Sequence, residues 1–103
     1  MLVKYRIEAE QVPVKGEHEA AKDLEQRYML IMSWLFDNEH IEVPEFSLVD
    51  GTIFWYQKPR RGYTRTEPRE IVANPGEWIV ITQLGVPEIY SDYDFKQHFL
   101  EDK

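Results

Sequence analysis

The residues in this sequence best suited to molecular recognition form a basic loop that follows an aromatic strand. We define the basic loop as residues 58–69, and it concentrates cations in a chain whose formal net charge is −7. Arginine and lysine can bind phosphates, and aromatic rings beside them can stack on bases. Arginine, tyrosine and tryptophan are also typical anchor residues of protein interfaces. The loop is therefore a candidate contact for a protein or a nucleic acid, or else a solvated connection. The candidate partner-binding residues are Trp55, Lys58, Arg60, Arg61, Tyr63 and Arg65.

A second charged group is acidic and begins on a predicted helix. Its members are Glu17, Glu19, Asp23 and Glu25, followed by Glu39, Glu42 and Glu45. Such a surface can imitate nucleic acid by presenting carboxylates where a partner expects phosphates. Lys22 and Arg27 interrupt the helix, so we favour a solvated helix face over mimicry.

No pattern in the sequence indicates catalysis or metal binding. The chain has no cysteine, which excludes disulfides, cysteine-ligated zinc and iron–sulfur sites, and thiol nucleophiles. The histidines have neither H-x-x-x-H nor H-E-x-x-H spacing, and the sequence contains no G-x-S-x-G or phosphate-binding glycine loop. We therefore predict a protein that is not an enzyme, with no catalytic residues, no cofactor and no metal.

Length and charge limit the class of protein further. The 103 residues suit one compact domain, residues 1–103, and 43% of them are hydrophobic. A net charge of −7 opposes non-specific attraction to nucleic acid or an anionic membrane. No apolar run approaches the ~20 residues that span a bilayer. We expect a cytoplasmic protein with no membrane partner.

The first half of the chain predicts a strand and a long helix. Residues 3–9 alternate apolar and polar, which is typical of a strand with one solvated face. From Glu17 to Phe36 the apolar residues recur at helical spacing, with Glu17 and Glu19 in the expected first turn. At its end the helix carries more apolar side chains than one sheet face needs, which would allow a homodimer; these are Met32, Trp34 and Phe36.

The second half predicts short strands and a closing helix. Residues 46–49 and 52–57 flank Asp50-Gly51, a pair that favours the type I′ turn of a hairpin. Further strands are expected at 69–73, 78–82 and 88–90, with the apolar 78–82 segment central in its sheet. Ser91 is a good N-cap for a final helix. The predicted fold is α+β: an antiparallel sheet of four to five strands, one long amphipathic helix packed on a face, and a short C-terminal helix.

The two ends of the chain carry a resemblance. Ile7-Glu8-Ala9-Glu10-Gln11 resembles the I-E-A-x-Q opening strand of a widespread group of small phage and prophage proteins. That group closes with a P-G-D-[WY]-I-[IV] strand, a G-E-x-Y-P turn and an F-x-x-x-[YF] helix. The matching residues are Pro75, Gly76, Glu77, Trp78, Ile79 and Val80, then Glu88 and Tyr90, then Phe95 and Phe99. The resemblance implies a phage origin and a compact α+β fold; it implies no activity and no site residues.

Together these observations lead to one functional hypothesis and one alternative. The hypothesis is a phage-encoded accessory protein in the bacterial host cytosol that binds a host macromolecule without catalysis, as inhibitors of host or anti-phage systems do. A host protein is the favoured partner, with nucleic acid as the alternative partner for residues 58–69. The alternative function is a small-molecule or nucleotide binder or enzyme, with a pocket lined by Trp55, Trp78 or Tyr90.

Overall fold

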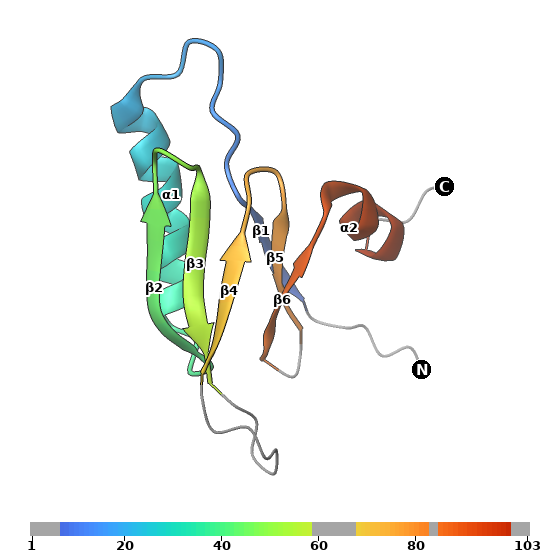
Figure 1. Cartoon of the computed structure of the whole chain (residues 1–103). Coiled ribbons are helices and arrows are strands. Elements are labelled where there is room, and N and C mark those ends of the chain that lie inside the picture. Colours follow the sequence, from blue (N-terminus) through green and yellow to red (C-terminus); the bar gives the residue numbers. More distant parts are fainter. Residues whose placement is uncertain (1–6, 59–67, 83–84, 100–103) are drawn as a thin grey trace.

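Six strands and two helices make up the part of the chain that the computed structural model describes, residues 7–58, 68–82 and 85–99. The strands form two three-stranded antiparallel sheets, ordered β1–β5–β6 and β2–β3–β4 (Figure 1). The elements are β1 (Glu8–Gln11), α1 (Ala21–Phe36), β2 (Ile41–Ser47), β3 (Thr52–Gln57), β4 (Arg69–Ala73), β5 (Trp78–Ile81), β6 (Pro87–Tyr90) and α2 (Asp92–Phe99).

The predicted α+β class, the long helix and the short C-terminal helix are confirmed, but the prediction of one sheet of four to five strands is wrong. A turn at Asn74–Glu77 joins β4 to β5, yet the two strands belong to different sheets. β5 pairs with β1 on one side and β6 on the other, so neither of its edges is left for β4. β5 is therefore central, as expected, in a sheet whose third strand comes from the start of the chain.

Helix α1 begins four residues after the predicted start because the preceding segment forms its own turn. The backbone N–H of Gly16 donates to Glu19 Oε1 at 2.9 Å, and Arg27 Nη1 approaches the same oxygen at 2.8 Å. These two contacts lower the pKa of the Glu19 carboxyl. Glu19 thus holds the entry to the helix from outside it, and Asp23 is the acidic residue of the first turn.

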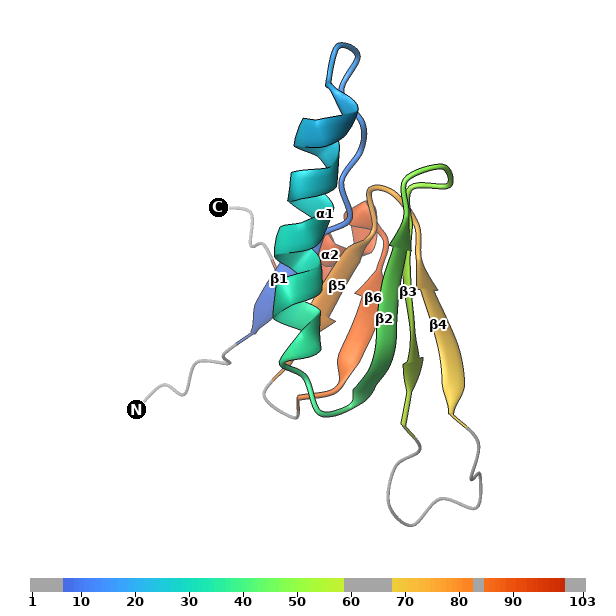
Figure 2. The same cartoon turned by 90° about the vertical axis from the view of Figure 1, so that its left-hand side faces the viewer.

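The main core lies between α1 and the two sheets (Figure 2). The buried stripe of α1 meets inward side chains of both sheets, and Tyr28 stacks on Phe46 with ring centroids 5.3 Å apart. Tyr28 also donates to the carbonyl of Gly51 at 2.8 Å, tying the helix to the β2–β3 turn. The fully buried side chains of this core include Val12, Leu35, Ile53, Trp55, Ala73 and Ile79.

Helix α2 covers the face of β1–β5–β6 that points away from the main core. Trp78 of β5 stacks on Phe95 of α2 with ring centroids 4.0 Å apart. The predicted cap is confirmed, because the backbone N–H of Asp94 donates to Ser91 Oγ at 3.0 Å. β5 therefore has covering side chains on both faces, with Ile79 in the main core and Trp78 against α2. In Figure 1 none of the described elements lies over the front of β2–β3–β4, the face turned away from α1.

Two local predictions need correction. The first hairpin strand occupies Ile41–Ser47, earlier than the predicted 46–49, because residues 48–51 form the turn. Only Gly51 has a positive φ there, at 77°, so the turn is not the type I′ turn predicted for Asp50-Gly51. The first strand is Glu8–Gln11, and residues 3–6 of the predicted strand lie outside the described residues.

Candidate functional site

The predicted contact residues lie in three different situations. Lys58 is exposed just after β3, and its backbone N–H donates to the carbonyl of His40 at 3.0 Å. Trp55 is fully buried in the core, so its ring offers no surface to a partner. The residues that lie outside the described ranges are Arg60, Arg61, Tyr63 and Arg65. Contact through the basic loop, with protein or nucleic acid, stays a prediction.

The inner face of β3 carries two polar atoms without partners among the described residues. They are the indole Nε1 of Trp55 and the amide Oε1 of Gln57, two positions apart on the same face of the strand. A buried donor or acceptor without a partner costs about 1–3 kcal/mol. Trp55 thus packs its ring in the core, and its indole nitrogen finds no hydrogen-bond partner among the described residues.

The outer face of β3 carries aromatic side chains where a solvated strand ordinarily has polar ones. Ile53 and Trp55 are completely buried, whereas the alternate residues Phe54 and Tyr56 point away from the core. Tyr56 is 42% exposed and Phe54 is partly buried. In an antiparallel sheet the solvated face normally carries polar residues. β3 differs from this pattern, because its central side chains are apolar or aromatic on both faces.

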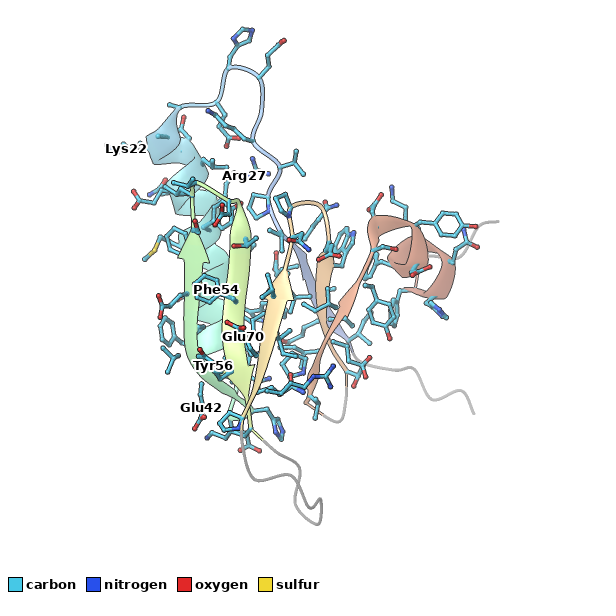
Figure 3. The ribbon with its side chains drawn as sticks, in the orientation of Figure 1. Lys22, Arg27, Glu42, Phe54, Tyr56 and Glu70 are labelled. Atoms are coloured by element: carbon cyan, nitrogen blue, oxygen red, sulfur yellow. The ribbon has the colours of Figure 1, made fainter. Side chains whose placement is uncertain are left out.

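The neighbouring strands surround these two rings with carboxylates and one aliphatic side chain. Tyr56 lies opposite Glu42 of β2 and Glu70 of β4, and Phe54 lies opposite Glu45 and Val72. Figure 3 shows the labelled side chains of this set on the front of the sheet. We name this surface the outer face and define it as Glu42, Glu45, Phe54, Tyr56, Glu70 and Val72.

A β-bulge shapes one border of the outer face. Between the pairs Glu42–Tyr56 and Glu45–Phe54, the β2 residues Val43 and Pro44 together oppose only Trp55. Val43 has φ 50° and is 62% exposed, while Pro44 is buried. A β-branched residue in the left-handed region is strained by roughly 1–3 kcal/mol, and such strain often occurs at functional sites. The bulge sets an additional apolar side chain beside the outer face.

The electrostatics of the outer face are acidic. Among the described residues, none of the three glutamates of the outer face takes part in an ion pair; the pairs found there lie elsewhere, on Glu17, Glu19, Glu39 and Asp92. Each carboxylate stands one strand away from an aromatic ring. The arrangement suits a ligand that is apolar in its middle and cationic at its edges.

The aromatic cluster around α2 is built for packing. Trp78 Nε1 donates to Asp92 Oδ1 at 2.9 Å, and Lys96 Nζ lies 3.0 Å from Asp92 Oδ2. The hydrogen bond from Trp78 and the contact with Lys96 lower the pKa of the Asp92 carboxyl. Tyr90 donates to Glu88, an interaction that raises the pKa of its hydroxyl, and its ring meets Phe99 edge-on.

The structure does not join the three aromatic residues proposed for a small-molecule pocket. Trp55 belongs to the main core, whereas Trp78 and Tyr90 lie on the far face of β1–β5–β6 with α2. Within residues 7–58, 68–82 and 85–99, no three His, Asp or Glu side chains gather in a metal-binding arrangement. The outer face is therefore the candidate functional site.

Comparisons with models of protein families, with curated proteins and with solved structures found no match to this chain. In the described part of the chain, neither helix combines the length and apolar character needed to cross a membrane.

Sequence reasoning chose Trp55 and missed Tyr56 and Phe54. The segment Ile53-Phe54-Trp55-Tyr56 is apolar at every position, so alternation alone cannot tell which face of the strand is buried. The sequence feature that could have identified the outward face of β3 is the set of glutamates on the flanking strands, Glu42, Glu45 and Glu70. Once the pairing is known, these residues mark the outward face.

Proposed function

We propose that this protein works by binding another protein through the outer face and catalyses no reaction. The observation that carries the proposal is the exposure of Tyr56 and its apolar neighbours on a sheet face that no other described element covers. Tyrosine and phenylalanine are enriched in interface cores, where they bury a large area at a small cost in side-chain freedom. The edges of the face are polar, as an interface rim is.

The further proposal is that the protein is a phage-encoded accessory protein and that its partner belongs to the host. This part rests on the motifs at the two ends of the chain. Their residues, such as Trp78 and Phe95, contact one another in the structure, so the motifs belong to the packing and not to the outer face. In this proposal the protein acts by occupying a surface of a host takeover target or an anti-phage defence protein.

The test is capture of the partner from bacterial lysate on the immobilised full chain. The parent chain is expected to retain a stoichiometric partner, and Tyr56→Glu is expected to lose it, because the change puts a charge in the centre of the contact. Replacing a tyrosine at the hot spot of an interface costs about 2 kcal/mol or more, roughly a thirtyfold change in affinity. Mass spectrometry of the eluate identifies the retained protein.

Two controls separate the outer face from other surfaces. Tyr93→Glu makes the same substitution on α2, where Tyr93 is 71% exposed, and should keep the partner. The triple variant Arg60→Ala, Arg61→Ala and Arg65→Ala tests the basic loop. A partner that survives Tyr56→Glu but is lost by the triple variant would assign the contact to the loop and refute our proposal. Absence of any stoichiometric partner at low salt would refute it as well.

A further inference from the structure

The outer face is apolar along its centre and acidic along both borders. Phe54 and Tyr56 follow one another on β3, about 6.7 Å apart along the strand. Glu42 and Glu45 border them on β2, and Glu70 borders them on β4. Figure 3 shows the labelled Glu42 and Glu70 on the two sides of the Tyr56 strand. A ligand that follows the apolar centre meets carboxylates on both flanks.

The width of this arrangement matches one α-helix. Neighbouring strands lie about 4.8 Å apart, so the two acidic borders are separated by about 10 Å. An α-helix with its side chains is about 10–12 Å wide. A helix lying along β3 would cover both aromatic rings and bring its flanking side chains to Glu42 and Glu70.

The charges decide what the flanks of that helix must carry. A close contact removes water from the glutamates, and a carboxylate that loses water without gaining a cation or hydrogen bonds is strongly disfavoured. Among the described residues, no cation of this chain forms an ion pair with Glu42, Glu45 or Glu70. Because no described residue of the chain neutralises these carboxylates, a partner that covers them is favoured when it brings its own cations.

Two other occupants fit the outer face poorly. A second copy placed face to face would bring two sets of the same three carboxylates together, and nucleic acid would add phosphates to them. We therefore propose that the outer face receives a basic amphipathic helix, with an apolar stripe on Phe54 and Tyr56 and lysine or arginine on both sides of the stripe. This inference rests on the proposed function, since it specifies the partner of the same face.

The probe for this inference is a synthetic helical peptide of leucine and lysine, with the leucines on one stripe and lysines on both sides. Amide chemical shifts of the full chain should change on β2, β3 and β4 when the peptide is added. Glu42→Gln with Glu70→Gln should weaken peptide binding about tenfold, equivalent to about 1.4 kcal/mol. The substitution keeps the shape of both side chains and removes their charges.

A matched pair of substitutions controls for general attraction between a basic peptide and an acidic protein. Glu10→Gln with Glu25→Gln also removes two negative charges, but at exposed positions on β1 and α1. Both double variants change the formal net charge from −7 to −5, so non-specific attraction falls equally in the two. Binding by the control pair should stay close to that of the parent chain.

The outcomes separate this inference from the proposed function. Equal weakening by both pairs, or shift changes centred on α1 or α2, would overturn the basic-helix assignment. If Tyr56→Glu abolishes capture of the lysate partner but the Glu42 and Glu70 pair does not weaken it, the outer face stands and the basic helix is wrong. A dimer mass in sedimentation that Tyr56→Glu converts to a monomer mass would identify a second copy as the occupant and overturn the inference.

Discussion

Asp92 links the acid stability of the protein to the attachment of α2. Its carboxylate accepts a hydrogen bond from Trp78 Nε1 and pairs with Lys96, and both contacts lower its pKa. A carboxyl with a lowered folded pKa stabilises the protein above its unfolded pKa, about 3.9 for aspartate, and this contribution is lost as the pH falls through the folded value. The parent chain should therefore lose stability below about pH 4.

Asp92→Asn tests this link, because the amide oxygen keeps an acceptor for Trp78 while the charge is removed. We expect the variant to be less stable than the parent at pH 7 and to approach it as the pH falls below the folded pKa of Asp92. Urea unfolding followed by tryptophan fluorescence at several pH values measures the difference. A difference that is independent of pH would show that the carboxylate charge contributes nothing.

Gly51 is a position where the backbone requires glycine. Its φ is 77°, and a Cβ there would lie 2.7 Å from Cγ of Pro75. Gly51→Ala should destabilise the protein by more than about 1 kcal/mol, since it combines a left-handed φ with a contact against a rigid ring. Gly16→Ala is the control, because a Cβ at Gly16 meets nothing closer than 3.5 Å. Equal unfolding midpoints in urea for the two variants would contradict the prediction.

At the scale of elements, α2 has one buried side chain, that of Phe95. The helix has eight residues, and isolated helices of this length are not stable in water. Phe95 is 5% exposed and stacks on Trp78, whereas Tyr93 on the same helix is 71% exposed. Phe95→Ala should cost about 3–5 kcal/mol or release the helix, while Tyr93→Ala should change stability by about 0.5 kcal/mol or less.

Hydrogen exchange distinguishes release of α2 from general destabilisation. In Phe95→Ala the amides of α2 should exchange faster than those of α1, because Phe95 contacts β5 and not the main core. A uniform increase in exchange over both helices would instead mean that α2 and α1 open together.

The helices and strands differ in how well the sequence predicts them. Periodicity was sufficient for α1, and turn and capping residues were sufficient for β4, β5 and α2, because these signals are local. The pairing of β5 with β1 joins distant segments, and nothing in either segment specifies it. The outer face depends in turn on non-local information, because the strand pairing and the position of α1 determine which side of Ile53-Phe54-Trp55-Tyr56 is covered.

For the molecule as a whole, one continuous core connects the two sheets. The buried cluster joins Ile79 from β1–β5–β6 to Ile53 and Trp55 from β2–β3–β4 through the apolar stripe of α1. Because neither sheet has this core to itself, the sheets should unfold together in a single transition. The outer face lies outside the cluster, so substitutions there test binding with little effect on folding.

Ile79→Ala and Val72→Ala test this division between core and surface. Ile79 is fully buried, so Ile79→Ala should lower the free energy of unfolding by about 2–5 kcal/mol. This is a large part of the total free energy of unfolding of a typical protein, about 5–15 kcal/mol. Val72 is 46% exposed on the outer face and should change stability by about 0.5 kcal/mol or less. In the parent and both variants, tryptophan fluorescence and far-ultraviolet circular dichroism should report the same midpoint. Separate midpoints in Ile79→Ala would mean that the sheets unfold independently, which a shared core does not allow.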